Sequence, residues 1–175
     1  MKLNTSRLKR LASSFRKKKI LVVGDLILDH HIFGRVERIS PEAPVPVVWA
    51  NRENFVCGGA ANVSLNLRSL GAGVSLCGVI GRDLFGKKLF SRMKDNGIDT
   101  SLVIKDSQRP TTLKTRILAH NQQVARLDWE SIEFLSLKLN TKILNKVKEN
   151  LSGFDAIIIE DYGKGVVNPD LVGKL

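Results

Sequence analysis

Apolar residues recur along the chain with two periods, one typical of buried strands and one typical of helices. The continuous apolar run at residues 20–24 ends in glycine and predicts a buried parallel strand. Similar runs predict strands at 74–80, 101–105 and 156–160, the last again buried. Helical spacing predicts helices at 59–70, 84–96 and 136–151, with Gly71 and Gly97 ending the first two. Alternating strands and helices predict an α/β fold whose sheet is largely parallel.

Two segments break this alternation. Pro41, Pro44 and Pro46 exclude a helix, and residues 45–50 are expected to form an edge strand, where the missing N–H donors are tolerated. Residues 111–119 and 122–129 are rich in Thr, Ile, Leu and Val around a short polar pair, which predicts a hairpin. We expect both segments to form a separate small sheet beside the main layer.

The N-terminus is basic and amphipathic. Residues 1–19 hold eight Lys or Arg and no acid, so most of the formal charge of +11 lies there. Apolar residues recur at helical intervals from residue 6 to 19, namely Leu8, Leu11, Ala12 and Phe15. One interpretation is a helix that lies on an anionic membrane or nucleic acid. The expected one is a helix that packs this narrow stripe on its own domain and leaves its basic face in solvent.

Composition narrows the class of protein. Hydrophobic residues make up 43% and charged residues 26%, which is typical of globular domains and excludes disordered, collagen-like and coiled-coil chains. There is no apolar run long enough for a membrane-spanning helix. Nucleic-acid binding is disfavoured because only Phe15 is interleaved with the N-terminal charges. Cys57 and Cys77 are expected to be reduced core residues of a cytoplasmic protein.

The first candidate ligand-binding residues lie at and just after the end of the first strand. Ligands of open α/β sheets bind beyond the carboxyl ends of strands, where Gly24 and Asp25 fall. Asp29, four residues on, could accept hydrogen bonds from sugar hydroxyls. The alternative is that one of the two Asp residues caps a loop and the other is solvated.

A glycine pair gives a sharper signal. Gly58 and Gly59 would let backbone N–H groups approach a ligand closely, and the helix that follows would favour polar or anionic groups at its N-terminus. Asn62, one turn into that helix, offers both a donor and an acceptor. The alternative is a tight turn that needs glycine only for its backbone angles.

Further charged residues follow other strands. Asp161 and Lys164 lie between glycines after the last strand and could hold a sugar hydroxyl and a phosphate, or form a solvated loop with a weak ion pair. Arg116 and Arg126 on the hairpin could bind a phosphate, or be exposed strand residues. The sequence contains no Ser/His/Asp set, zinc-ligand spacing or phosphate-binding loop of the Walker type, and its three histidines are too scattered to indicate a metal.

The residues at the carboxyl end predict a short helix. Asn168 is a good N-cap and is followed by proline at the first helical position. A crossover helix normally leads to another parallel strand, but the sequence ends at Leu175. We therefore expect the chain to be the front part of a longer protein.

The glycine and asparagine pattern resembles the ribokinase-like (PfkB) carbohydrate kinases. Their first signature is matched by residues spread over 58–81: Gly58, Gly59, Ala60, Asn62, Ser64, Gly71 and Gly81. Within the family the likeness is to the kinases of D-glycero-β-D-manno-heptose 7-phosphate, carried by residues 23–29, 38–47, 58–62, 121–123 and 161–165. The likeness runs from about residue 20 to the end of the chain.

The resemblance implies a ribokinase-like three-layer sandwich with a small β-sheet lid at about 35–50 and 111–129, cut short at the C-terminus. Residues 1–19 would be a separate basic helix. Asp29, Gly58, Gly59 and Asn62 would hold sugar hydroxyls, Arg116 the 7-phosphate, and Asp161 and Lys164 would lie near the active site. The lid would form a homodimer contact.

The family's second signature, Gly-Ala-Gly-Asp, supplies the catalytic base and the anion hole, and it does not occur in this sequence. We expect it beyond Leu175, together with the ATP site, so that ATP and Mg²⁺ would bind only in the complete enzyme and this chain alone would transfer no phosphate. The alternatives are another sugar or nucleoside kinase of the family, or a non-catalytic module that binds a sugar phosphate or dimerises.

Overall fold

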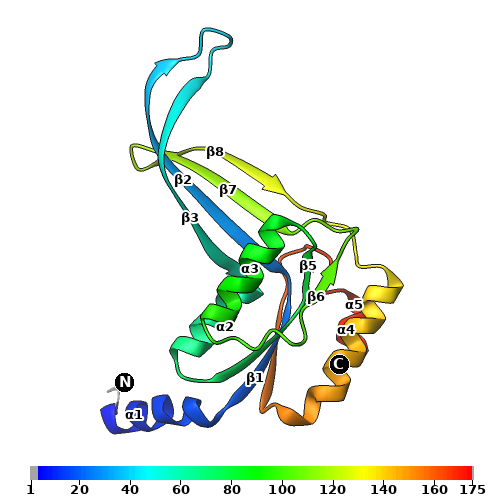
Figure 1. The fold of residues 1–175 in the computed structure, drawn as a ribbon. Coiled ribbons are helices and arrows are strands. Elements are labelled where there is room, and N and C mark those ends of the chain that lie inside the picture. Colours follow the sequence, from blue (N-terminus) through cyan, green and yellow to red (C-terminus); the bar gives the residue numbers. More distant parts are fainter. Residues whose placement is uncertain (1–3, 175) are drawn as a thin grey trace.

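The computed structural model of the chain describes residues 4–174 and builds them around a parallel sheet (Figure 1). Three strands form this sheet in the order β4-β1-β9, with β1 (Lys19–Gly24) in the centre between β4 (Gly73–Cys77) and β9 (Ala156–Glu160). Both pairings are parallel, so their carboxyl ends lie at one edge. The run of apolar residues in β1 is buried on both faces, as its sequence predicts.

Helices cover both faces of the sheet. Alternation along β1 sends Val22 into a core with α2 (Ala60–Ser69) and α3 (Leu84–Asp95). Its neighbours Leu21 and Val23 enter a second core with α4 (Leu137–Asn150) and α5 (Pro169–Lys174). The expected three-layer, ribokinase-like arrangement is therefore confirmed. The expected cap of α5 is present too, since the Asn168 side chain accepts a hydrogen bond from the Leu171 N–H at 2.8 Å.

The strand expected at 74–80 is two strands. After β4 the chain passes Gly78 and forms β5 (Val79–Gly81), which pairs in parallel with β6 (Ile104–Asp106) in a separate sheet. A Cβ atom on Gly78 would lie 2.5 Å from the carbonyl oxygen of Gly24. This close approach of two backbones diverts the chain from the main sheet, and an apolar run cannot reveal it.

A second sheet is the lid. Its order is β3-β2-β7-β8, formed by β2 (Leu26–Ile39), β3 (Pro46–Gly59), β7 (Thr112–Ala119) and β8 (Gln122–Trp129). His120 and Asn121 both have positive φ, as a two-residue hairpin turn requires. The separate sheet is confirmed, but it is longer than expected, because β2 starts, and β3 ends, close to the main sheet. Beyond Gly34, β3 is the only partner of β2 in the part of the chain that the structure describes, and this hairpin projects from the molecule (Figure 1).

Two expectations about packing are wrong. The helix α1 (Thr5–Ser14) continues into a 3₁₀ turn, η1 (Phe15–Lys17), and no residue of either is buried. Because β1 begins at Lys19, the helix before it lies past the end of the sheet (Figure 1). The strand β9 is only partly buried, since it lies at the edge of the three-stranded sheet.

Both cysteine side chains are buried, as expected for core residues. Burial raises the pKa of Cys57, and it raises that of Cys77 to about 12. Within residues 4–174, no helix is long and apolar enough to cross a membrane.

Candidate functional site

The carboxyl end of β1 is organised by Asp25, whose side chain is almost fully buried. Its carboxylate accepts backbone hydrogen bonds from Tyr162 at 2.8 Å, Lys164 at 3.0 Å and Val166 at 3.1 Å. Its carbonyl oxygen accepts another from Ala60, at the start of α2. Of the two alternatives for Asp25, the loop cap is therefore the correct one, and the residue ties the loop at 161–167 to the main sheet.

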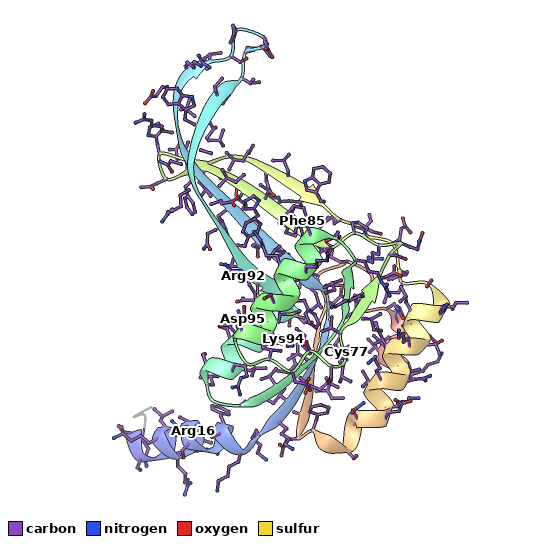
Figure 2. All side chains as sticks on the ribbon, viewed as in Figure 1. Arg16, Cys77, Phe85, Arg92, Lys94 and Asp95 are labelled. Atoms are coloured by element: carbon purple, nitrogen blue, oxygen red, sulfur yellow. The ribbon has the colours of Figure 1, made fainter. Side chains whose placement is uncertain are left out.

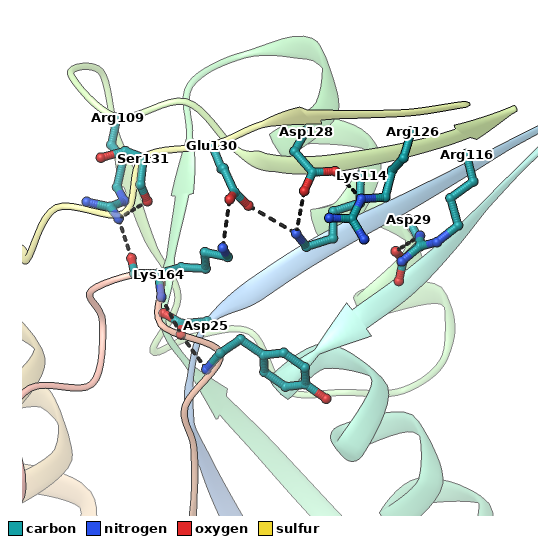
Figure 3. Close-up of polar contacts among 11 residues, drawn as sticks. Asp25, Asp29, Arg109, Lys114, Arg116, Arg126, Asp128, Glu130, Ser131 and Lys164 are labelled. Atoms are coloured by element: carbon teal, nitrogen blue, oxygen red, sulfur yellow. Dashed lines mark hydrogen bonds and ion pairs between the residues drawn. The ribbon is translucent and has the colours of Figure 1, made fainter. Parts of the chain in front are cut away.

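Asp29 belongs to strand β2, and its side chain is not freely solvated. It forms an ion pair with Arg116 of β7, and both side chains are largely shielded from solvent (Figure 3). A Cβ atom on Gly58 would lie 2.3 Å from an Asp29 carboxylate oxygen. The absence of a side chain at position 58 thus makes room for the Asp29 carboxylate, and the two residues lie next to each other.

The glycine pair leads directly into α2. Gly59 is its N-cap with φ +54°, a conformation that disfavours any residue with a Cβ. A Cβ there would also lie 2.3 Å from the Asp25 carbonyl oxygen. Asn62 follows in the first turn of the helix and is exposed. Asp29, the glycine pair and the N-terminus of α2 therefore lie next to one another, as the sequence predicts.

The structure separates Asp161 from Lys164. The Asp161 carboxylate is exposed and accepts a hydrogen bond from the Gly163 N–H at 2.8 Å, within its own turn. The Lys164 ammonium instead pairs with Glu130 at 2.7 Å, just after lid strand β8. The ion pair of Lys164 is therefore not the local one considered from the sequence, and it joins the loop to the lid.

A row of alternating charges on the lid was missed. Glu130 also binds Lys114 at 3.1 Å, and Lys114 reaches Asp128 at 3.1 Å. Asp128 in turn pairs with Arg126 at 3.1 Å (Figure 3). Burial alone would raise the pKa of Glu130, but its hydrogen bonds to Lys164 and Lys114 outweigh burial and lower it. The signal for this row was available, because Arg126 and Asp128 of β8 and Glu130 just after it are spaced by two, as residues on one face of an extended strand are.

Arg109 fixes the same loop from the other side. Its guanidinium donates hydrogen bonds to the carbonyl oxygens of Ser131 at 2.7 Å and of Lys164 (Figure 3). It donates another to the carbonyl oxygen of Glu133 at 3.0 Å. The segment after β8 and the loop after β9 are therefore held together by one side chain. No pattern in the sequence marks Arg109 for this role, because all three acceptors are backbone groups.

The opposite face of the lid is apolar. It forms a groove of about 300 Å³ together with Phe85 of α3. The lid residues that line it come from three strands: His30, Ile32, Leu113, Thr115, Ile117, Leu127 and Trp129. The lid thus has a charged face, which carries Asp29 and Arg116, and an apolar face turned away from them.

Most of the chain, including the residues just described, matches the model of a known protein family. Residues 17–161 match the model of the pfkB family carbohydrate kinases. The chain belongs to the pfkB family. The match includes Asp29, the glycine pair, Asn62 and Arg116, and it ends at Asp161, so Lys164 lies just beyond it.

Curated relatives extend the likeness at high identity. The chain is 51% identical over 154 residues to a protein of Helicobacter pylori strain J99 named "Bifunctional protein HldE", covering 88% of this chain. A protein of the same name from Wolinella succinogenes is 46% identical over 159 residues, covering 91% of this chain. The chain spans about a third of the length of these relatives, 33% and 34% respectively.

Solved structures show the pfkB fold alone. A carbohydrate kinase from Agrobacterium tumefaciens superposes with a TM-score of 0.60 at 22% identity, over 81% of this chain and 45% of that one. The ribokinase of Arabidopsis thaliana, solved with ribose and ATP, superposes with a TM-score of 0.56 at 17% identity, over 81% of this chain and 53% of that one.

Proposed function

We propose that this chain forms the sugar-binding part of a carbohydrate kinase whose substrate is D-glycero-β-D-manno-heptose 7-phosphate, phosphorylated at O1 with ATP. The observation that carries the proposal is the position of Asp29: its carboxylate lies over Gly58 and beside the N-terminus of α2. The heptose is inferred from the sequence likeness to heptose 7-phosphate kinases and from the relatives named HldE. We place the enzyme in the cytoplasm.

Each residue has a defined part in the proposed site. The Asp29 carboxylate accepts hydrogen bonds from sugar hydroxyls, because an ionised carboxylate offers acceptors only. Gly58 and Gly59 leave the backbone open to the sugar ring, and Asn62 adds a donor and an acceptor. Arg116 binds the 7-phosphate with the N–H groups that remain, since its contact with Asp29 uses only one nitrogen.

Lys164 and Asp161 belong to the part of the proposed site that is formed by the loop after β9. The Lys164 ammonium is shared with Glu130 in the structure and reaches a phosphate only by exchanging this partner. We assign ATP and Mg²⁺ to no residue of this chain, because the Gly-Ala-Gly-Asp signature that would supply the catalytic base and the anion hole does not occur in its sequence. No step of phosphoryl transfer is therefore derived from these residues, and the chain alone is proposed to be inactive.

The lid is also the proposed homodimer contact. Within residues 4–174, the hairpin beyond Gly34 pairs with no third strand, and an isolated two-stranded hairpin is only marginally stable in water. It carries exposed apolar side chains, including Ile39, Val45 and Trp49. A second copy of the lid would cover these side chains.

The test is calorimetric titration of the 175-residue chain with heptose 7-phosphate and, separately, with fructose 6-phosphate. We expect the heptose to bind more tightly. Asp29→Asn should weaken its binding by about tenfold to a hundredfold, because hydrogen bonds to a charged group contribute about 1.5–3 kcal/mol. Asn62→Ala should weaken it by a smaller factor, because it removes hydrogen bonds of a neutral side chain.

The matched control is Asp95→Asn, which changes an exposed carboxylate in the last turn of α3 (Figure 2). It should bind the sugar like the unchanged chain. Circular dichroism spectra identify any variant that fails to fold. If the folded chain binds neither sugar phosphate, or if Asp29→Asn binds the heptose unchanged, the proposal is wrong; tighter binding of fructose 6-phosphate would indicate another sugar kinase of the family.

A further inference from the structure

The helix α1 presents an apolar stripe that no described part of the chain covers. Leu8 is 46% exposed, Leu11 50% and Phe15, at the start of η1, 38%. These three residues recur at helical intervals and lie on one side of the helix. The helix stands apart from the body (Figure 1), although its start is well formed, because Asn4 caps the Ser6 and Arg7 N–H groups.

Basic residues border the stripe. At 3.6 residues per turn, Arg7 and Lys9 lie about 100° to either side of Leu8 around the helix axis. Arg16 and Lys17 continue the positive charge into η1. Within residues 4–174 no ion pair involves any of these four side chains, whereas Lys18 pairs with Asp155 at 2.7 Å. The positive charge around the stripe is therefore not neutralised by the body.

We propose that α1 and η1 form an interfacial segment that binds reversibly to an anionic lipid surface. A stripe of Leu and Phe flanked by Lys and Arg suits the boundary between head groups and acyl chains, where apolar burial and charge attraction act together. The combination of apolar and basic side chains on one surface favours a lipid bilayer as the partner. A nucleic acid would be attracted by the charges alone, and bare leucines would contribute nothing to its phosphate contacts.

The segment does not depend on the sugar site. Its residues are distant in the sequence from Asp29 and the glycine pair, and the site is held by Asp25, Arg109 and the lid. Membrane attachment by a single short helix is weak and depends on ionic strength, because the charge term is screened within about 10 Å at 0.1 M salt.

The experiment is co-sedimentation of the 175-residue chain with vesicles of phosphatidylcholine, with and without phosphatidylglycerol. We expect binding only to the vesicles with phosphatidylglycerol, and a decrease of that binding as salt is raised. Leu8→Gln with Leu11→Gln should reduce the partition coefficient by tenfold or more, since full burial of one leucine side chain corresponds to about tenfold. Arg7→Gln with Lys9→Gln should reduce it by about fivefold per residue.

The matched control is Leu84→Gln with Leu137→Gln, which removes two leucines that are 70% and 84% exposed elsewhere on the body. It should sediment with the vesicles like the unchanged chain. The proposal is overturned if the Leu8/Leu11 variant binds as the unchanged chain does, or if the chain retards duplex DNA and ignores vesicles. A change from dimer to monomer in the Leu8/Leu11 variant without vesicles would also overturn it, since a second copy would then cover the stripe.

Discussion

Replacing Asp25 with asparagine tests whether one buried carboxylate holds the loop after β9 in place. One carboxylate oxygen accepts the N–H groups of Tyr162 and Lys164, and the other accepts that of Val166. An asparagine side chain has one oxygen and one NH₂ group. Whichever way the amide turns, the NH₂ group therefore faces at least one backbone N–H, and that donor loses its acceptor.

The expected cost follows from these contacts. A buried donor left without a partner costs about 1–3 kcal/mol, and the remaining hydrogen bonds are weakened because their acceptor is no longer charged. We expect Asp25→Asn to lower the free energy of unfolding by about 2–4 kcal/mol. The assay is urea unfolding at pH 7, followed by far-UV circular dichroism.

The control is Asp161→Asn in the same loop. Its exposed carboxylate accepts one hydrogen bond, from Gly163, which the asparagine oxygen can also accept. We expect a change within about 0.5 kcal/mol, as for most surface substitutions. Amide exchange at Tyr162, Lys164 and Val166 should speed up only in Asp25→Asn. If Asp25→Asn unfolds within about 0.5 kcal/mol of the unchanged chain, the reasoning about this loop is refuted.

Two further predictions concern titration and thiol reactivity. Burial raises the pKa of Asp83 and Asp99, but hydrogen bonds from Thr111 and Ser101 help to lower them overall. Their stabilising effect is complete above the unfolded value near 4 and lost as the pH falls through the lower folded values. Urea midpoints should therefore be constant from about pH 7 to 5 and fall below about pH 4; a midpoint that rises on acidification contradicts this. Because burial raises the pKa of Cys77 to about 12, iodoacetamide at about pH 8 should label it only in urea, as read by mass spectrometry; rapid labelling of the folded chain would contradict the burial.

The main sheet and its helices were predictable because their apolar periods are long and regular. The lid strands were predicted too short for a physical reason. The stretch from Asn51 to Asn54 is polar and exposed, so no alternation of apolar and polar residues marks it as a strand. The division of the run at 74–80 depends on a close contact with Gly24, which lies far away in the sequence.

For the candidate site, the sequence indicated which residues take part, but it did not indicate which side chains they contact. Asp29 and the glycine pair were each recognised from a motif with short internal spacing, and the antiparallel pairing of β2 with β3 brings them next to each other. The partners of Arg116 and Lys164 lie 87 and 34 residues away, and only the strand register brings them together. The register also explains the charged row on the lid, since Lys114 lies opposite Asp128.

The central position of β1 has a consequence for synthesis on the ribosome. Its first neighbour, β4, follows within about fifty residues, but its second neighbour begins only at Ala156, which pairs with Ile20. At about 5–20 residues per second, the ribosome needs on the order of ten seconds to make the intervening chain. During that time one edge of β1 lacks its partner strand, and the carboxylate of Asp25 lacks its backbone hydrogen-bond donors. The nascent chain therefore exposes an apolar strand edge, and folding factors that bind such edges would have their longest opportunity here.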